Sequence, residues 1–383
     1  MLARFRRLVH SSPTLQHAVA HARAIARRRQ HPEGLPPEVP RRIIVEPTNG
    51  CNLRCQYCGN KDMVRPWTYM PMDLYVRMLD EMVELGIPRL TLHTIGEPTL
   101  NPRLPEMVEQ ATERRRCVTL SSNGTLWTEA LARRVVRAGP EVLNFSADAA
   151  EQAVIDKTRE GLDLDKLLAT LHLVKRLRDE EGPVRDDTPW GRVQLPTITM
   201  TCVLSQHFTR AVEKRYFEVF GGLVDDFLFH EPNNHADYVQ NQPFYKPYTL
   251  LRGKLRDKLY KRIREPCPYP WDSLYLLSDG SVSVCRFDFD ARINLGKYGE
   301  SNVMDLWQGQ KMRSLRRAHM QFDFSEWTPC ENCSGTFYEN REVHYRRTRR
   351  AMRRNGVVPR RDAWLPVNPN RVAIGDPAGR DVR

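Results

Sequence analysis

Short apolar and β-branched segments alternate with longer segments of helical periodicity between residues 42 and 231. In the longer segments, apolar residues recur three and four positions apart, as on one face of a helix. Strand–helix units in series predict a parallel sheet covered by helices. The expected strands are residues 43–46, 90–93, 118–121, 142–146, 197–204 and 227–230, and the expected helices are residues 72–85, 104–115, 128–138, 165–179 and 209–220.

The length of this region decides between a closed and an open barrel. A complete eightfold barrel needs about 250 residues, whereas these six units occupy residues 42–231. The expected fold class is therefore α/β, with a partial (β/α)6 TIM-like barrel. A hairpin over residues 273–277 and 282–285 then begins a smaller unit. The expected organisation is a basic helical extension (1–41), the barrel (42–231), a connecting insertion (232–266), the small domain (267–340) and a basic tail (341–383).

The distribution of charge bears on the class of partner. The formal net charge is +12, but residues 1–42 carry +7 and residues 341–383 carry +8, which leaves the intervening body at −3. An enzyme that binds nucleic acid would more usually place a basic stripe on its folded surface, so we expect no nucleic-acid partner. The Arg-rich tails could instead dock an acidic electron donor or line an entrance for an anionic substrate.

The start of the chain and its hydropathy bear on location. No apolar stretch reaches the roughly 18 residues that cross a bilayer, so no transmembrane segment is expected. The first 31 residues lack the apolar core of a secretory signal. We expect a cytoplasmic protein, with a transit peptide or a membrane-surface helix as alternatives for the Arg-rich start.

Three cysteines follow the first expected strand within eight residues, at Cys51, Cys55 and Cys58. Thiolates are soft ligands that suit iron, and three of them in one loop can hold three irons of a four-iron cluster. The fourth iron then has no protein ligand. A zinc site is the alternative, but this spacing matches no common zinc pattern.

This Cys-x3-Cys-x2-Cys loop, with Tyr57 before the last cysteine, resembles that of the radical S-adenosylmethionine superfamily. The resemblance implies that S-adenosylmethionine chelates the open iron of a 4Fe-4S cluster and is cleaved to methionine and a 5′-deoxyadenosyl radical. A flavodoxin-type or ferredoxin-type electron donor is implied as the partner. Further residues at the carboxyl ends of successive strands resemble the family's cofactor contacts: Gly96, Glu97, Ser121, Asn123, Ser146 and Arg159. Ile95 replaces the first glycine of the family's Gly-Gly-Glu segment.

Four later cysteines form a second constellation: Cys267, Cys285, Cys330 and Cys333. Their spacing and the intervening residues resemble the SPASM module in its shortened twitch form, which implies a small domain with one auxiliary 4Fe-4S cluster. Four protein ligands leave no open iron, so such a cluster would carry electrons rather than bind substrate. A four-cysteine zinc ribbon is the alternative.

The expected reaction is epimerisation with Cys202 as the catalytic hydrogen-atom donor, and dehydrogenation of the same alcohol is the alternative. If its thiol faces the barrel interior, it can return a hydrogen atom to a carbinol radical, and the enzyme is an epimerase. If Cys202 packs in the core, the auxiliary cluster can take an electron instead, and the enzyme is a dehydrogenase.

The expected substrate is a sugar, a nucleotide-sugar or an aminocyclitol, since hydrogen-bonding side chains follow the sixth strand. A peptide-modifying maturase is the alternative of a different class. The candidate substrate residues are His230, Glu231, Asn233 and Asn234.

Overall fold

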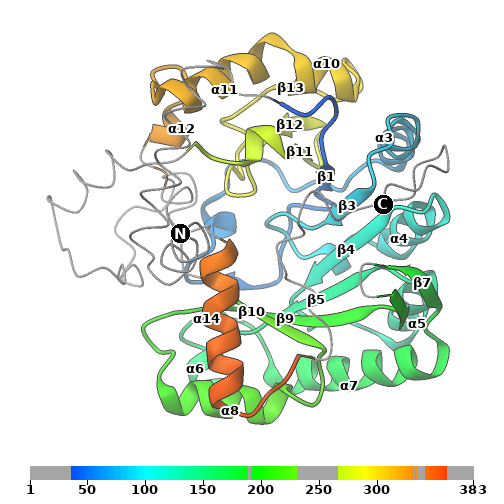
Figure 1. Cartoon of the computed structure of the whole chain (residues 1–383), viewed down its shortest axis with the longest axis vertical. Coiled ribbons are helices and arrows are strands. Elements are labelled where there is room, and N and C mark those ends of the chain that lie inside the picture. The colour runs from blue at the N-terminus through cyan, green and yellow to red at the C-terminus, as the bar shows by residue number, and fades with distance from the viewer. Residues whose placement is uncertain (1–35, 189–190, 231–265, 332, 334–340, 360–383) are drawn as a thin grey trace, which may run out of the picture.

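The computed structural model describes residues 36–188, 191–230, 266–331, 333 and 341–359. Its main sheet has nine strands in the order β10-β9-β5-β4-β3-β1-β11-β12-β13 (Figure 1). Six of these strands are mutually parallel and confirm the expected barrel: β1 (Arg42–Val45), β3 (Arg89–Leu92), β4 (Cys117–Ser122), β5 (Val142–Ser146), β9 (Thr197–Val203) and β10 (Asp226–His230).

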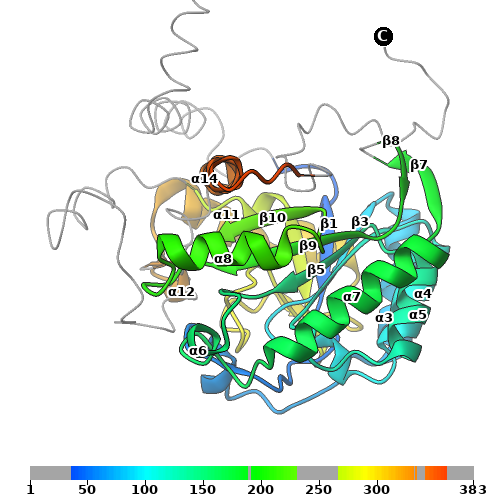
Figure 2. The same ribbon diagram turned by 90° about the horizontal axis from the view of Figure 1, so that it is seen from below.

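Helices surround the outside of this curved parallel sheet (Figures 1 and 2). The ends of five of them agree with the expected ranges to within a few residues, and the short helix over residues 152–155 was not expected. Thr128, Asp163 and Thr209 accept backbone hydrogen bonds at the starts of three of these helices. The helices are α3 (Met72–Glu84), α4 (Leu104–Glu113), α5 (Glu129–Ala138), α6 (Gln152–Ile155), α7 (Leu164–Glu181) and α8 (Arg210–Phe220).

The core of the barrel lies between the sheet and these helices. Successive residues of a strand point to opposite faces, and one set of alternate positions is apolar and almost fully buried. Val45, Leu92, Leu120 and Phe145 belong to this set. The opposite set forms the inner face of the barrel, on which the active site is described below.

The small domain continues the same sheet. β11 (Ser273–Leu276) pairs in parallel with β1, at the opposite side of β1 from β3. β12 (Ser281–Ser283) and β13 (Gly296–Lys297) follow it in antiparallel pairing. The hairpin was expected from sequence, but its pairing with the first barrel strand was not. The helices of this part are α10 (Val303–Gln308), α11 (Gln310–Gln321) and α12 (Thr328–Glu331).

Short elements complete the barrel region. β2 (Arg54–Cys55) pairs with β6 (Arg159–Glu160), and β7 (Val184–Thr188) pairs with β8 (Gly191–Gln194). Single 3-10 turns occur at η1 (Gly59–Asp62), η2 (Pro98–Leu100) and η3 (Tyr269–Trp271).

The segment expected as a solvated basic tail begins with a packed helix, α14 (Arg341–Arg354), which lies beside β10 (Figure 1). In the described part of the chain, β10 is the last strand of the sheet, and no strand pairs with its outer edge. Thr348 of α14 accepts a hydrogen bond from the Phe229 backbone N–H at 2.9 Å, and Arg349 pairs with the buried Asp226 carboxylate. The helix therefore covers the open edge of the partial barrel.

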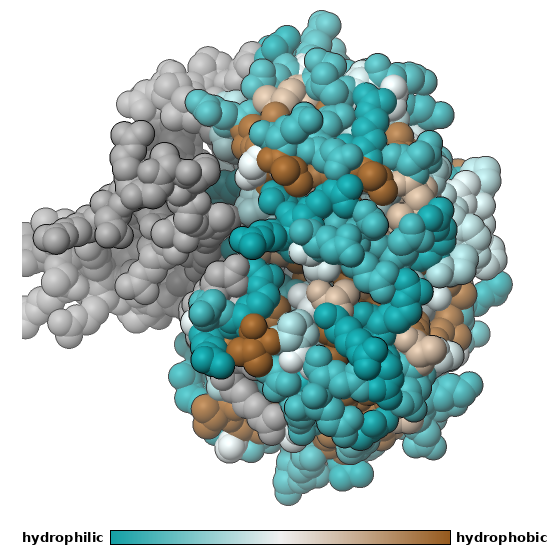
Figure 3. Space-filling model, turned by 90° about the vertical axis from the view of Figure 1, so that its right-hand side faces the viewer, coloured by the Kyte–Doolittle hydropathy of each residue, from teal (hydrophilic) through white to brown (hydrophobic). Residues whose placement is uncertain are grey.

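In the described part of the chain, no helix is long and apolar enough to cross a membrane. The face shown in Figure 3 is largely hydrophilic, with apolar residues in small separate patches.

Candidate active site

The three-cysteine loop leaves the carboxyl end of β1 and is fixed by a short ladder. Cys55 lies in β2, and its register partner in β6 is Arg159. The Gln56 N–H also donates to the Thr158 carbonyl at 3.0 Å. The loop is therefore tied to the segment that follows β5, across the mouth of the barrel.

The thiols of this loop fit the iron cluster expected from sequence. Cys51, Cys55 and Cys58 are free thiols, and the charge of Cys55 acts on the pKa of both Cys51 and Cys58. Burial raises the pKa of Cys51 and of Cys58 to about 12, whereas the nearby Arg159 acts in the opposite direction. The Leu53 N–H also donates to Cys51 Sγ at 3.5 Å. Bound iron would supply the positive charge that buried thiolates need.

Arg159 is held in a buried ion pair beside these cysteines. Its guanidinium contacts the Asp148 carboxylate at 3.0 Å and lies over the Tyr57 ring, 5.5 Å from the centroid. The Tyr57 hydroxyl donates to the same carboxylate at 2.6 Å, and so does the Val203 N–H at 2.9 Å. Asp148 therefore links the cysteine loop to the ends of β5 and β9, and Arg159 lies beside that loop.

Two glycines allow the loops after β1 and β3 to approach each other. A Cβ on Gly96 would lie 2.1 Å from the Thr48 carbonyl oxygen, and one on Gly50 would lie 2.2 Å from the Trp67 ring. Neither neighbour can move away easily, because the Trp67 indole donates to the Thr48 hydroxyl at 2.9 Å. Any side chain at Gly96 would therefore displace the loop that carries Cys51.

Glu97 joins the loops after β3 and β4. Its buried carboxylate accepts from the Asn123 N–H at 2.7 Å, from the Ser122 hydroxyl at 2.8 Å and from the Thr99 hydroxyl at 2.7 Å. The Asn123 amide in turn donates to Asn52 of the cysteine loop at 2.8 Å. Glu97 and Asn123 thus hold the loops in place, and their side chains already have partners.

The inner face of the barrel carries a connected row of polar side chains. Asn144 donates to Ser121 and to Thr201, both at 3.2 Å, and accepts from Thr199 at 3.0 Å. Ser146 contacts the Thr201 hydroxyl at 3.0 Å. These residues come from β4, β5 and β9, so the sequence-predicted Ser121 and Ser146 are brought together through Asn144 and Thr201. Hydroxyl and amide groups of this kind suit a polyhydroxylated ligand.

Cys202 lies on the opposite face of β9. Its register partner in β10 is Phe229, whose ring packs edge-on against Tyr216 of α8. Cys202 is 0% exposed, and its Sγ is 3.7 Å from the Asp148 carbonyl oxygen. Burial raises the pKa of the thiol well above its ordinary value. This placement corrects the expectation of an inward-facing thiol, since alternation along β9 turns Cys202 toward the helices while Thr201 faces inward.

The cysteines of the small domain also lie near one another. The charges of Cys333 and Cys267 both act on the Cys285 thiol, whose pKa burial raises well above its ordinary value. The Phe287 N–H donates to Cys285 Sγ at 3.4 Å. Cys330 is buried in the same apolar cluster as Cys285, and Cys267 packs against it. A buried thiol that accepts a backbone hydrogen bond and has other thiols close by fits an iron-sulfur cluster.

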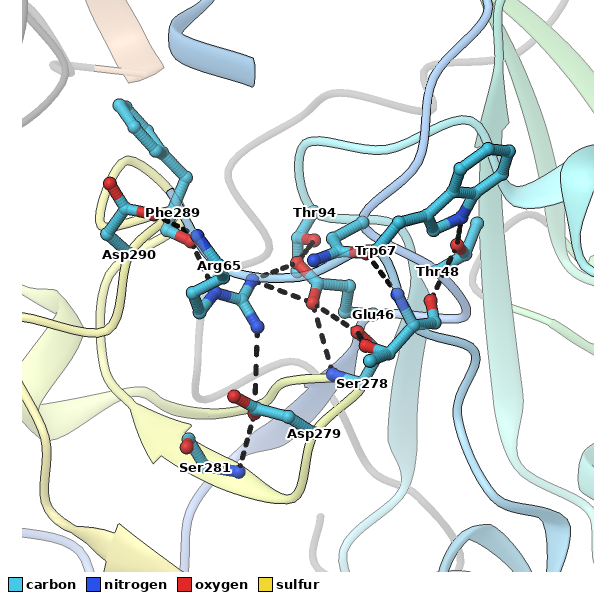
Figure 4. A network of polar contacts seen from close by, with 12 residues as sticks. Glu46, Thr48, Arg65, Trp67, Thr94, Ser278, Asp279, Ser281, Phe289 and Asp290 are labelled. Carbon is cyan, nitrogen blue, oxygen red and sulfur yellow. Dashed lines mark hydrogen bonds and ion pairs between the residues drawn. The ribbon is translucent and has the colours of Figure 1, made fainter. Parts of the chain in front are cut away.

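A buried ion pair lies between the barrel and the small domain (Figure 4). Arg65, from the loop after the three cysteines, donates to both carboxylate oxygens of Glu46 at the end of β1. The hydroxyl of Ser278, at the tip of the small-domain hairpin, donates to Glu46 at 2.8 Å. Arg65 also donates to the Phe289 carbonyl at 2.6 Å. Since Phe289 lies four residues after Cys285, this network connects the loops that carry both cysteine sets.

The expected substrate residues are only partly described. His230 ends β10 and is half-buried. Glu231, Asn233 and Asn234 lie outside the described residues. Sequence reasoning did not select Glu46, Arg65, His93 or Asn144, because each is ordinary in its local pattern. The one signal available was their position, since three of them lie in or directly after a barrel strand.

Comparisons with known proteins agree with this geometry. Residues 45–180 match the radical SAM superfamily, and residues 267–334 match an iron-sulfur cluster-binding domain known as SPASM. A tungsten-containing aldehyde ferredoxin oxidoreductase cofactor-modifying protein of Pyrococcus furiosus is 30% identical over 322 residues, which cover 75% of this chain and 86% of that protein.

Two further similarities concern the reaction and the fold. An S-adenosyl-L-methionine-dependent 2-deoxy-scyllo-inosamine dehydrogenase of Niallia circulans is 21% identical over 306 residues, which cover 79% of this chain and 96% of that protein. The crystal structure of Streptococcus suis SuiB bound to its precursor peptide SuiA shares the fold, with a TM-score of 0.59 and 14% identity over 80% of this chain and 71% of that one.

Proposed function

This chain belongs to the radical S-adenosylmethionine superfamily and carries a SPASM cluster-binding domain, and from that premise we propose that it oxidises a secondary alcohol to a ketone. The substrate class is a polyhydroxylated small molecule such as an aminocyclitol or a sugar. The observation that carries the proposal is the pair of opposite faces of β9, on which Thr201 faces the polar interior and Cys202 faces the apolar core.

The choice of oxidation over epimerisation follows from what the inner face offers. Epimerisation needs a hydrogen-atom donor beside the substrate radical, and the thiol expected to supply it packs against the helices instead. Oxidation needs an electron acceptor, and the second set of cysteines provides a place for one. The 2-deoxy-scyllo-inosamine dehydrogenase, which matches along almost its whole length, supports the same reaction class.

The roles of the chain's own residues follow from their contacts. When bound, S-adenosylmethionine and its cluster supply a radical that removes hydrogen from carbon, and the auxiliary cluster takes up one electron. Cys51, Cys55 and Cys58 would hold the first cluster, and Cys267, Cys285, Cys330 and Cys333 the second. Ser121, Asn144, Ser146 and Thr201 provide hydroxyl and amide groups that orient polar groups of the ligand. The buried Arg159–Asp148 pair keeps the cysteine loop closed over that face.

The test is product analysis with anaerobically reconstituted enzyme, S-adenosylmethionine and a chemical reductant in deuterated water. The panel contains 2-deoxy-scyllo-inosamine, common sugars and a synthetic peptide that contains serine and threonine. We expect a product lighter than its substrate by two hydrogens, without solvent deuterium on the reacting carbon. A product that differs in composition from its substrate only by one solvent deuterium in place of a hydrogen on carbon would establish epimerisation instead. Modification of the peptide alone would identify the protein as a peptide-modifying maturase.

A further inference from the structure

His93 directly follows β3 and belongs to the inner face. The register pairs Leu92 of β3 with Val45 of β1 and with Leu120 of β4. One residue further along each strand, His93 lies between Glu46 and Ser121. Leu92 is part of the core that faces the helices, so alternation turns His93 toward the interior.

The neighbours of His93 in this layer already have partners. Glu46 accepts from Arg65, and Ser121 accepts from Asn144. Among the residues that the structure describes, His93 itself makes no hydrogen bond, and its Nδ1 is buried without a partner. Buried polar groups are almost always satisfied, so an unsatisfied one needs an explanation. The residue as a whole keeps part of its surface exposed, so a ligand can reach it.

Two arginines that neighbour the cysteine sets act on His93. The charges of Arg286, next to Cys285, and of Arg159, beside Cys55, both act on the imidazole. Together with burial, which is the largest cause, they lower the pKa of His93 to about 4. The imidazole is therefore neutral at neutral pH, and a nitrogen lone pair is available to accept a proton.

We propose that His93 accepts the hydroxyl proton of the substrate during the oxidation, a role that rests on the proposed function. Conversion of a secondary alcohol to a ketone removes two protons and two electrons. A hydrogen atom goes from the carbinol carbon to the 5′-deoxyadenosyl radical, the hydroxyl proton goes to His93, and the remaining electron goes to the auxiliary iron-sulfur cluster, a one-electron oxidant. The O–H bond breaks as the C=O double bond forms.

The hydroxyl group of the radical intermediate is acidic enough for a weak base to remove its proton. A hydroxyl group on a radical carbon is a stronger acid than the parent alcohol, and its proton becomes far more acidic as the electron leaves and the C=O bond forms, so even a weakly basic imidazole can accept it. A base must lie within hydrogen-bond reach of the proton that it removes. His93 lies in the same layer of the barrel as Ser121 and Asn144, which would orient the substrate hydroxyl groups.

The test uses two variants of the reconstituted enzyme, His93→Asn and His93→Gln, with 2-deoxy-scyllo-inosamine deuterated at the reacting carbon. Both replacements keep a polar side chain but cannot take up a proton. We expect each to bind S-adenosylmethionine within about twofold of wild type and still to move deuterium into 5′-deoxyadenosine. Ketone formed per 5′-deoxyadenosine should fall by about 10²-fold, the usual effect of losing a general base. His172→Asn, on the exposed face of α7, serves as the matched control and should change neither ratio.

Several outcomes would overturn the role of His93. An unchanged ratio of ketone to 5′-deoxyadenosine would show that the proton goes elsewhere. A large loss of S-adenosylmethionine affinity in both variants would place His93 in the cofactor site instead. If label transfer and ketone fall in the same proportion, His93 only shapes the pocket. Failure of the wild-type enzyme to make ketone from any alcohol would instead contradict the proposed function. Failure of the His93 role and failure of the proposed function are therefore distinguishable.

Discussion

Arg65 donates from Nη2 to both carboxylate oxygens of Glu46, at 2.8 and 3.0 Å, and the two side chains are 8% and 0% exposed. The pair lies where β1 of the barrel meets the hairpin of the small domain (Figure 4). Burial of two charges is unfavourable unless both are paired and hydrogen-bonded. Here Thr94 and Ser278 also donate to Glu46, so the carboxylate is fully engaged by three separate segments of the chain.

Removal of Arg65 should strongly destabilise the protein. Arg65→Ala leaves the Glu46 carboxylate buried without its cation, and we expect the free energy of unfolding to fall by about 3–5 kcal/mol. Arg103→Ala, which removes the exposed pair with Glu106, should lower it far less, because water screens an exposed pair. Denaturant unfolding, followed by circular dichroism, measures both. Equal losses in the two variants would contradict the importance assigned to the buried pair.

The two sets of cysteines should separate two partial activities. Wild type should contain about eight irons per chain, the sum of two four-iron clusters. Cys51→Ala should retain about four and lose cleavage of S-adenosylmethionine. Cys285→Ala should also retain about four but keep reductive cleavage while losing ketone formation. Iron assay and chromatography of 5′-deoxyadenosine provide the measurements, and zinc in place of iron at the second set would refute its redox role.

Cys202→Ala should leave the reaction intact. The thiol packs in the core with Tyr216 and Phe229, so its loss creates a cavity about the size of a methyl group and costs roughly 1 kcal/mol. Ketone formed per 5′-deoxyadenosine should stay within about twofold of wild type. A stalled reaction or a trapped intermediate in this variant would restore the hydrogen-donor role.

Arg349 should be important for stability although it lies in an Arg-rich segment. It pairs with Asp226, which is 0% exposed, so Arg349→Ala removes a charged hydrogen-bond donor from a buried carboxylate. We expect a loss of about 3–5 kcal/mol. The exposed neighbour Arg350 on the same helix is the matched control, and Arg350→Ala should change the free energy of unfolding by less than about 0.5 kcal/mol. Comparable effects of the two substitutions would mean that α14 is not needed to cover β10.

His93 should make stability depend on pH. The folded state lowers its pKa from about 6.5 to about 4. Between these two pH values, the imidazole binds a proton in the unfolded chain but stays neutral in the folded one. The stability contributed by neutral His93 is therefore present above about pH 6.5 and is lost as the pH falls toward 4. His93→Asn should lose less stability than wild type between pH 7.5 and about 5.5, whereas His172→Asn should follow wild type. Parallel curves for wild type and His93→Asn would show that the imidazole titrates normally.

Most of the barrel was predictable because its signals are local. Apolar periodicity marked all six parallel strands and the helices between them, and capping side chains such as Thr128 and Thr209 fixed the helix starts. Ser121 and Ser146 could be selected from sequence because each lies at the end of a strand that this local pattern marks. By contrast, the pairing of β1 with β11 joins residues more than 200 positions apart, and no local pattern encodes it.

The sequence by itself determined that seven cysteines form two groups and that one group follows the first strand of a parallel sheet. Spacing along the chain is sufficient for such conclusions, since ligands of one cluster can lie in one loop. Only the tertiary structure decided which face of β9 carries Cys202, that Arg65 meets Glu46 and that the His93 Nδ1 has no partner among the described residues. These depend on which side of each strand the helices cover and on which distant segments meet, and both are set by packing rather than by local sequence.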